Sequence, residues 1–219
     1  MNDCNGCVLL LHFDEPQGST TFHDDSGFGN DATCSGPLCP AIAVNGISGS
    51  GLLFDGLDDF LFIASSTLLN VQEQLTLEAW FKVSDNAQQP IIEWNDGTNS
   101  GVHMWTNVYG FQWGGKGTGA NLVDTTGNEF DYVISTHDPP INQWHHLAVT
   151  YNQTTGIAQV YLDGSLAQEQ TLGTFIPQTS YDLYLGKRPT LSDGLHLHGL
   201  MDEVAIYDRV LTTGEILDH

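Results

Sequence analysis

Basic side chains are scarce in this sequence. Lys and Arg together number 5, against 27 Asp and Glu, which gives a formal net charge of −22 at pH 7. Such an excess of carboxylates repels phosphate backbones and anionic lipid head groups within about a Debye length of the surface. The charge balance therefore argues against nucleic acid and membrane surfaces as partners. It suits divalent cations, which prefer oxygen ligands.

Long apolar runs are also missing. No hydrophobic stretch approaches the roughly 20 residues of a membrane span, and the start Met-Asn-Asp-Cys has neither a basic nor an apolar leader segment. We therefore expect no membrane insertion, and a domain excised from a larger protein. Because 40% of the 219 residues are hydrophobic, the chain can fill one large core, and we predict one domain over residues 1–219.

Cysteine is confined to the N-terminal part of the chain, at Cys4, Cys7, Cys34 and Cys39. An even number of nearby cysteines predicts two local disulfides, and with them an oxidising, extracellular compartment. Three pairings are open at this point. A zinc site built from the two pairs is the alternative, which the run Cys34-Ser-Gly-Pro-Leu-Cys39 does not favour.

Short apolar runs alternate with Gly, Asn, Asp and Pro about every ten residues, which is typical of strands and turns in a sandwich. The predicted strands are residues 8–13, 51–54, 60–63, 75–83, 89–94, 101–105, 110–113, 145–152, 156–162, 182–185 and 199–207. Thr212 and Glu215 have the spacing of a capping box and predict a short helical turn. Residues 114–140 have few core-like side chains, and we expect an insertion that folds over one face.

Seven motifs follow one another in a fixed order along nearly the whole chain. They are Leu11-His-Phe-Asp14, Asp25-Ser-Gly-Phe-Gly-Asn30, Gly51-Leu-Leu-Phe-Asp-Gly-Leu-Asp-Asp-Phe60, Leu75-Thr-Leu-Glu-Ala-Trp-Phe81, Trp144-His-His-Leu-Ala-Val-Thr-Tyr151, Val160-Tyr-Leu-Asp-Gly164 and Gly199-Leu-Met-Asp-Glu-Val-Ala-Ile-Tyr207. Together they resemble the laminin G-like jelly rolls of the concanavalin A-like lectin and glucanase superfamily. The resemblance implies an all-β fold, a two-sheet antiparallel jelly-roll sandwich. It says far less about the ligand, because function depends on sites placed on folds.

The resemblance also implies a structural calcium ion, where the loop after the first strand meets the last strand. It places Asp25, Asn30 and Asp202 there as metal ligands. The physical argument agrees, since calcium needs six to eight oxygens, and Asp and Asn in glycine-rich loops supply them. The alternative is that Asp25 and Asn30 only form hydrogen-bonded turns.

The carboxylates that glycanases of this fold need are not apparent. Such enzymes carry two acids about 5 Å apart on either side of the scissile bond, and this sequence has no Glu-x-Asp-x-x-Glu run. Glu93 and Asp96 form the carboxylate cluster that comes nearest to this motif. The other possible pair of catalytic acids is Glu93 with Glu78, across strands. The five cations are too few for a lyase that neutralises uronates. We therefore predict that the chain is not an enzyme, with a divergent hydrolase or lyase as the less favoured alternative.

One stretch combines aromatic rings with polar side chains in the pattern that carbohydrate binding requires. A sugar ring stacks its apolar face on Trp or Tyr, and amides and carboxylates meet its hydroxyls. The candidate ligand-binding residues are Trp94, Asn95, Asp96, Trp105, Tyr109 and Trp113. We predict a binding module for polysaccharide or for the glycans of glycoproteins. A module for adhesion to another protein stays open, and some of these indoles could belong to the core.

Overall fold

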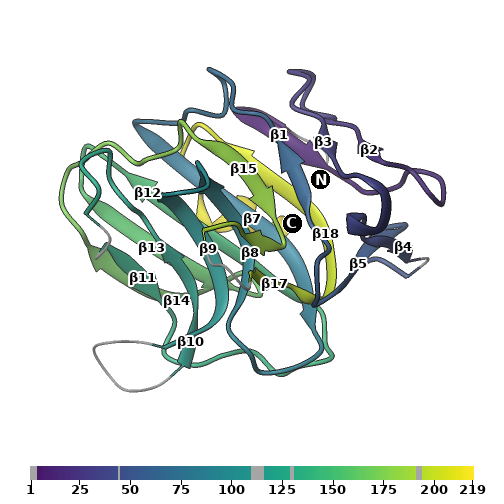
Figure 1. The fold of residues 1–219 in the computed structure, drawn as a ribbon. Coiled ribbons are helices and arrows are strands. Elements are labelled where there is room, and N and C mark those ends of the chain that lie inside the picture. Colours follow the sequence, from purple (N-terminus) through teal and green to yellow (C-terminus); the bar gives the residue numbers. More distant parts are fainter. Residues whose placement is uncertain (1–3, 44, 110–115, 129–130, 191–193) are drawn as a thin grey trace.

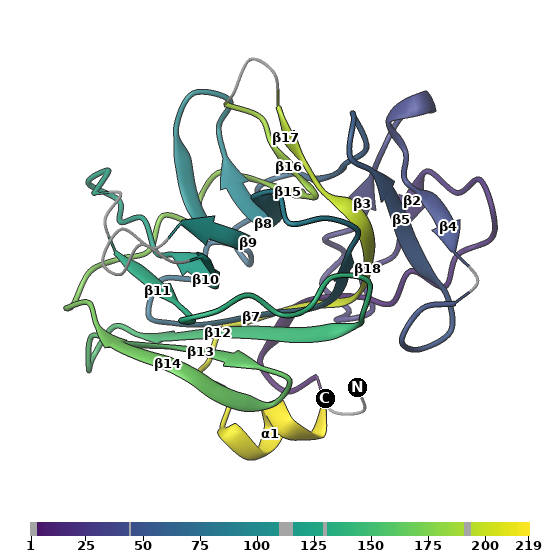
Figure 2. The ribbon, with the colours of Figure 1, turned by 90° about the horizontal axis from the view of Figure 1, so that it is seen from below.

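Two antiparallel sheets, stacked face to face, make up the fold (Figures 1 and 2). The computed structural model describes residues 4–43, 45–109, 116–128, 131–190 and 194–219. The all-β jelly-roll prediction is confirmed. Among the described residues, no helix is long and apolar enough to cross a membrane.

The first sheet has the strand order β14-β13-β12-β7-β18-β5-β4, and β1 pairs with β18 as well. Its strands are β1 (Cys7–Leu11), β4 (Ala41–Ala43), β5 (Gly51–Asp55), β7 (Gln74–Val83), β12 (His145–Asn152), β13 (Ile157–Leu162), β14 (Ser165–Thr171) and β18 (His198–Tyr207). The first and last strands therefore lie side by side, with Leu10 opposite Ala205.

The second sheet has the order β11-β10-β9-β8-β15-β6-β3-β2. Its strands are β2 (Thr21–Phe22), β3 (Ala32–Thr33), β6 (Leu61–Ile63), β8 (Gln89–Asn95), β9 (Ser100–Tyr109), β10 (Lys116–Asn121), β11 (Tyr132–Ile134) and β15 (Asp182–Leu185). A separate two-stranded ribbon, β16 (Lys187–Arg188) with β17 (Leu195–His196), lies against β8.

The main core fills the space between the two sheets. In β7, the alternation of side chains sends Leu75, Leu77, Ala79 and Phe81 into this core, as predicted from the sequence. In the paired strand β12, Leu147, Val149 and Tyr151 do the same. The alternating pattern of these two strands thus fixes which face of the first sheet points inward.

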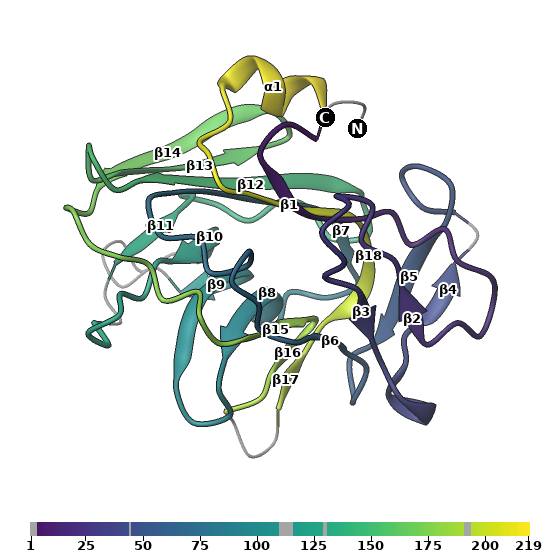
Figure 3. The same ribbon diagram turned by 90° about the horizontal axis from the view of Figure 1, so that it is seen from above.

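A short helix, α1 (Thr213–Asp218), packs against part of the outer face of the first sheet (Figures 2 and 3). The predicted capping box is present, because the Thr212 side chain accepts from the Glu215 backbone while the Glu215 side chain accepts from that of Thr212. Ile216 is on the side of the helix that faces the sheet, where it packs with Tyr161 and Tyr207 in a second apolar cluster. The helix consequently shields this cluster on the outer face of the first sheet from solvent.

Both predicted disulfides are present, and they join Cys4 to Cys7 and Cys34 to Cys39. The described part of residues 114–140 supplies β10 and β11, which extend the second sheet beyond β9. The predicted strand at 110–113 lies outside the described residues.

Candidate functional site

A pocket of about 260 Å³ lies on the outer face of the second sheet. In β9, Val102 and Met104 point into the core. The residues that alternate with them, His103 and Trp105, therefore point outward. The lining residues are Gln88, His103, Trp105, Val108, Gly119, Ala120, Asn121, Tyr132, Ile134 and Arg188. This set combines aromatic and aliphatic walls with amide and guanidinium groups, which is the composition of small-ligand sites.

A buried ion pair forms one side of the pocket. Nε of Arg188 lies 3.0 and 2.9 Å from the two carboxylate oxygens of Glu93, and the Glu93 side chain has no exposed surface. Burial raises the pKa of Glu93, and the charge of Arg188 opposes that rise. The guanidinium carbon also lies 4.2 Å from the centre of the Trp105 ring, a cation–π contact.

Two further donors hold Glu93 in place. The Trp105 indole donates to Oε2 at 3.0 Å, and Nδ2 of Asn95 donates to Oε1 at 2.8 Å. In every described hydrogen bond of Glu93, the carboxylate is the acceptor and never the donor, which is the pattern of the ionised form. The cluster fixes the orientation of Trp105 and Arg188 at the pocket wall.

His103 is the other titratable ring of the pocket. Burial, with a smaller contribution from the charge of Arg188, lowers its pKa to about 3. Its Nδ1 lies 2.8 Å from the Gly101 carbonyl oxygen, and its ring meets Trp105 edge to face. His103 is therefore neutral at physiological pH, and no other lining residue that the structure describes is a histidine.

The structure separates the residues that the sequence suggested for sugar binding. Trp105 lies in the pocket wall but is only 1% exposed, because Arg188 stacks on its ring, and Asn95 supports the wall through Glu93. Trp94 is fully buried in the main core, where its indole offers no surface to a ligand. Asp96 is exposed and closes the β8–β9 turn by accepting from Thr98 and Asn99. The side chain of Tyr109 and the whole of Trp113 lie outside the described residues.

Each of the three predicted metal ligands has its own partners within the protein. Asn30 uses both ends of its amide, donating to the Val8 carbonyl at 2.8 Å and accepting from the Ser66 hydroxyl at 2.8 Å. The Asp25 carboxylate lies 4.0 Å from His12, whose other ring nitrogen contacts Glu203. Asp202 accepts from the loop of residues 46–50.

Backbone donors hold both oxygens of the Asp202 carboxylate, with Glu203 donating to Oδ1 at 2.9 Å. The Asp202 side chain is fully buried, and its Oδ2 accepts from the backbone of Ile47 at 2.7 Å and of Ser48 at 3.2 Å. A Cβ at Gly46 would lie 2.2 Å from the Ser50 carbonyl oxygen and 2.5 Å from Asp202 Oδ2. Only glycine thus lets the loop fold this closely around the carboxylate. Asp14 accepts from Ser50 at the other side of the loop, so carboxylate and carbonyl oxygens, which calcium prefers, gather here.

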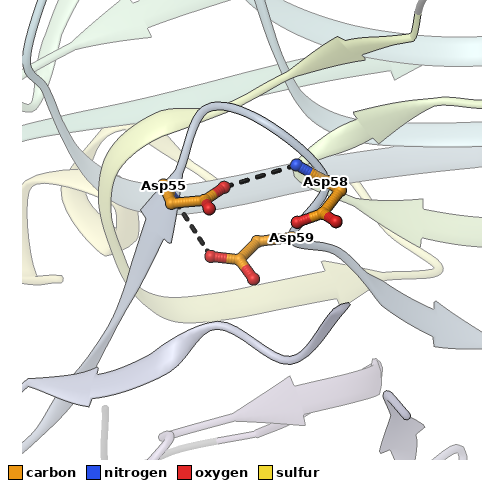
Figure 4. A group of neighbouring side chains, drawn as sticks. All are labelled: Asp55, Asp58 and Asp59. Atoms are coloured by element: carbon orange, nitrogen blue, oxygen red, sulfur yellow. Dashed lines mark hydrogen bonds between the residues drawn. The ribbon is translucent and has the colours of Figure 1, made fainter. Parts of the chain in front are cut away.

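A second group of acids, Asp55, Asp58 and Asp59, lies in the turn between β5 and β6, and the three carboxylates face one another (Figure 4). Asp55 Oδ1 accepts from the backbone of Leu57 and of Asp58, and Asp59 Oδ2 accepts from that of Asp55. These hydrogen bonds are those of a tight turn. The hydrogen bond from Leu57 lowers the pKa of Asp55, whereas burial raises that of Asp59.

Of the candidate catalytic acids, Glu93 and Glu78 lie on opposite sides of the sandwich. Glu93 belongs to the pocket on the second sheet, and Glu78 lies under α1 on the first, where Tyr207 and His219 contact it. Acids arranged in this way cannot flank one glycosidic bond. His145 and His146 have structural contacts, to Asp163 and to Glu78 respectively.

The family model described as the concanavalin A-like lectin/glucanases superfamily, a laminin G model, matches residues 55–217. The chain belongs to this superfamily. The matched range includes every lining residue of the pocket and also Asp202, whereas Asp14 and the loop around Gly46 precede it. No curated protein matches the chain.

Solved structures share the fold at low sequence identity. Domain 4 of AbnA, an extracellular arabinanase from Geobacillus stearothermophilus solved with arabinotriose, has a TM-score of 0.71 at 19% identity, with 97% of both chains covered. The receptor binding domain of botulinum neurotoxin D has a TM-score of 0.70 at 16% identity, covering 98% of this chain and 52% of that one. Trypanosoma rangeli sialidase, solved with 2,3-difluorosialic acid, has a TM-score of 0.65 at 16% identity, covering 97% of this chain and 32% of that one.

The pocket includes residues that the sequence did not single out. Gln88, His103, Asn121, Tyr132 and Arg188 come from five separate segments, and only the fold brings them together. Arg188 carried one usable signal, since it is one of only 5 basic residues in a strongly acidic chain. A rare cation next to a strand is a reasonable candidate for a buried ion pair.

Proposed function

We propose that this chain is a carbohydrate-binding module whose ligand occupies the pocket beside Trp105 and Arg188. The observation that carries the proposal is the combination of an aromatic wall with donor groups held rigidly by the buried carboxylate of Glu93. A pocket of about 260 Å³ lies just below the roughly 300–1,000 Å³ of sites that enclose drug-sized ligands, and it suits one sugar-sized group. The arabinotriose bound to domain 4 of the arabinanase supports this ligand class.

We propose further that the module does not cleave its ligand. Among the lining residues that the structure describes, none is Asp or Glu. The adjacent Glu93 is held by Arg188, Trp105 and Asn95. A general acid or nucleophile needs a free carboxyl within hydrogen-bonding distance of the substrate, and this carboxylate is already engaged.

Titration calorimetry with a panel of oligosaccharides tests both statements. We expect at least one oligosaccharide to bind, and Tyr132→Ala to weaken its binding about tenfold or more, because an aromatic contact of this kind contributes over 1 kcal/mol. Tyr184→Ala is the matched control. Tyr184 belongs to β15, its ring packs on that of Phe62, and it does not line the pocket. No new reducing ends should appear when the wild type is incubated with the ligand. Equal loss of binding in both variants would contradict the assignment of the pocket.

A structural calcium ion at Asp202 is a second proposal, supported by the oxygen-rich loop of residues 46–50. Bound there, the ion would fix the loop against the first sheet. Asp14, Asp202 and the Ser50 carbonyl are the residues that would hold it. The two disulfides support an extracellular location.

A further inference from the structure

The Glu93–Arg188 pair leaves part of the guanidinium without a partner. Nε of Arg188 carries both contacts to Glu93. Nη2 is buried and has no hydrogen-bond acceptor among the residues that the structure describes. A buried donor without an acceptor is unfavourable and rare in native proteins. Nη2 is out of reach of a ligand, and it is the exposed 18% of the Arg188 side chain that lines the pocket and can meet a ligand oxygen.

The charge of the same guanidinium, in contrast, is already neutralised. Glu93 lies within 3.0 Å of Nε and, with only donors around it, is ionised. His103 is neutral, and the other described lining residues are amide, aromatic, aliphatic or glycine. The pocket thus offers a strong hydrogen-bond donor with no net positive charge.

A ligand carboxylate at the exposed part of Arg188 would therefore come close to the buried negative charge of Glu93. Like charges separated by a few ångströms in a poorly solvated site repel strongly. The net charge of −22 adds to this repulsion over longer distances. A sugar hydroxyl or ring oxygen accepts the same hydrogen bond without it.

Building on the proposed function, we infer that the pocket selects neutral sugars over uronic acids and that Glu93 is the residue that determines this choice. The exposed part of Arg188 supplies the hydrogen bond, Tyr132 and His103 supply the aromatic wall, and Glu93 removes the positive charge that an acidic sugar would need. The selection is thus made by a residue that lies behind the pocket wall.

Calorimetry with matched trisaccharides tests the inference. The probes are galactotriose and cellotriose, each compared with the trisaccharide of the corresponding uronic acid, with arabinotriose as a further neutral ligand. We expect the wild type to bind at least one neutral trisaccharide about tenfold or more tightly than any uronate, at physiological salt. Glu93→Gln keeps the shape of the side chain but leaves Arg188 charged, and it should strengthen uronate binding about tenfold.

The outcomes distinguish the two proposals. If the wild type binds a uronate as tightly as its neutral counterpart, the inference about charge is wrong while sugar binding stands. If it binds none of the five probes, both the proposed function and the inference are contradicted. The wild-type comparison decides the question even if Glu93→Gln fails to fold, which circular dichroism would reveal. A folded Glu93→Gln variant with unchanged selectivity would show that Glu93 does not determine it.

Discussion

The hydroxyl of Tyr207 donates a hydrogen bond to Oε1 of Glu78, 3.0 Å away, between strands β18 and β7 of the first sheet. Burial, followed by the charge of Glu78, raises the pKa of Tyr207, so the phenol keeps its proton and is the donor. Neither side chain has appreciable exposed surface. The carboxylate consequently depends on protein donors in place of water.

Tyr207→Phe should lower the free energy of unfolding by about 1–3 kcal/mol, because it removes one of the donors of a buried carboxylate. Urea unfolding measures this loss. Tyr184→Phe is the control, since its ring packs on Phe62 at the other sheet, and it should change the stability much less. Equal effects of the two substitutions would show that the hydrogen bond to Glu78 is unimportant.

Glu78 should also make the stability depend on pH. Burial opposes its ionisation, but His146 and His219 outweigh burial and lower the pKa from 4.5 to about 2. The unfolded carboxyl thus binds a proton first as the pH falls, and stability present above about pH 4.5 is lost on the way to pH 2. The change in pKa corresponds to on the order of 3 kcal/mol.

His219 gives the same interaction an alkaline limit. Its hydrogen bond to Glu78 raises its pKa, so its contribution is complete below the unfolded value of about 6.5 and is lost as the pH rises through the raised value. Urea unfolding of Glu78→Gln between pH 2.5 and 8 should show a weaker dependence at both ends. Glu73→Gln, at an exposed position, should retain the wild-type profile, and a Glu78→Gln profile parallel to it would contradict the assignment.

Neighbouring residues of α1 should respond very differently to truncation. Ile216 is 1% exposed and packs with Tyr161 and Tyr207, whereas Leu217 is 66% exposed. Ile216→Ala should cost about 2–5 kcal/mol through the cavity it leaves, and Leu217→Ala should change the stability by no more than about 0.5 kcal/mol. Thermal unfolding of the two variants measures the difference. Similar melting temperatures would mean that α1 does not pack on the first sheet as described.

Calcium should raise the melting temperature if Asp202 and the loop of residues 46–50 hold the ion. At 100 times the dissociation constant, binding to the folded state alone adds about 2.7 kcal/mol. Asp202→Ala should remove this increase, and a chelator should reverse it in the wild type. Asp96→Ala is the control, because Asp96 closes an exposed turn elsewhere. A calcium effect that survives Asp202→Ala would place the ion at another site.

Elements with a regular local pattern were the ones that the sequence predicted well. The strict alternation in β7 and β12, the capping box of α1 and the short cysteine separations are all local signals. Strands of two or three residues, such as β2, β3 and β11, are too short to show any period. They form because neighbouring strands offer them hydrogen-bonding partners.

The pocket was harder to predict for two physical reasons. The β8–β9 register shifts between Pro90 and Ile92 and again between Glu93 and Asn95, so the sequence does not tell which residues of β8 lie beside the outward-facing residues of β9. Trp94 and Trp105 are equally suitable for a ligand by residue type, but Trp94 alternates with Glu93 and points into the core. Arg188 reaches Glu93 across 95 residues of sequence, and no local pattern reports such a contact.

The pairing of β1 with β18 affects how the protein can fold during synthesis. Three strands made early, β1, β5 and β7, each pair with β18. Until the ribosome has released the last strand, all three present unpaired backbone groups, and such edges favour aggregation. A growing chain of this protein should therefore need the protection of chaperones until β18 has emerged from the ribosome.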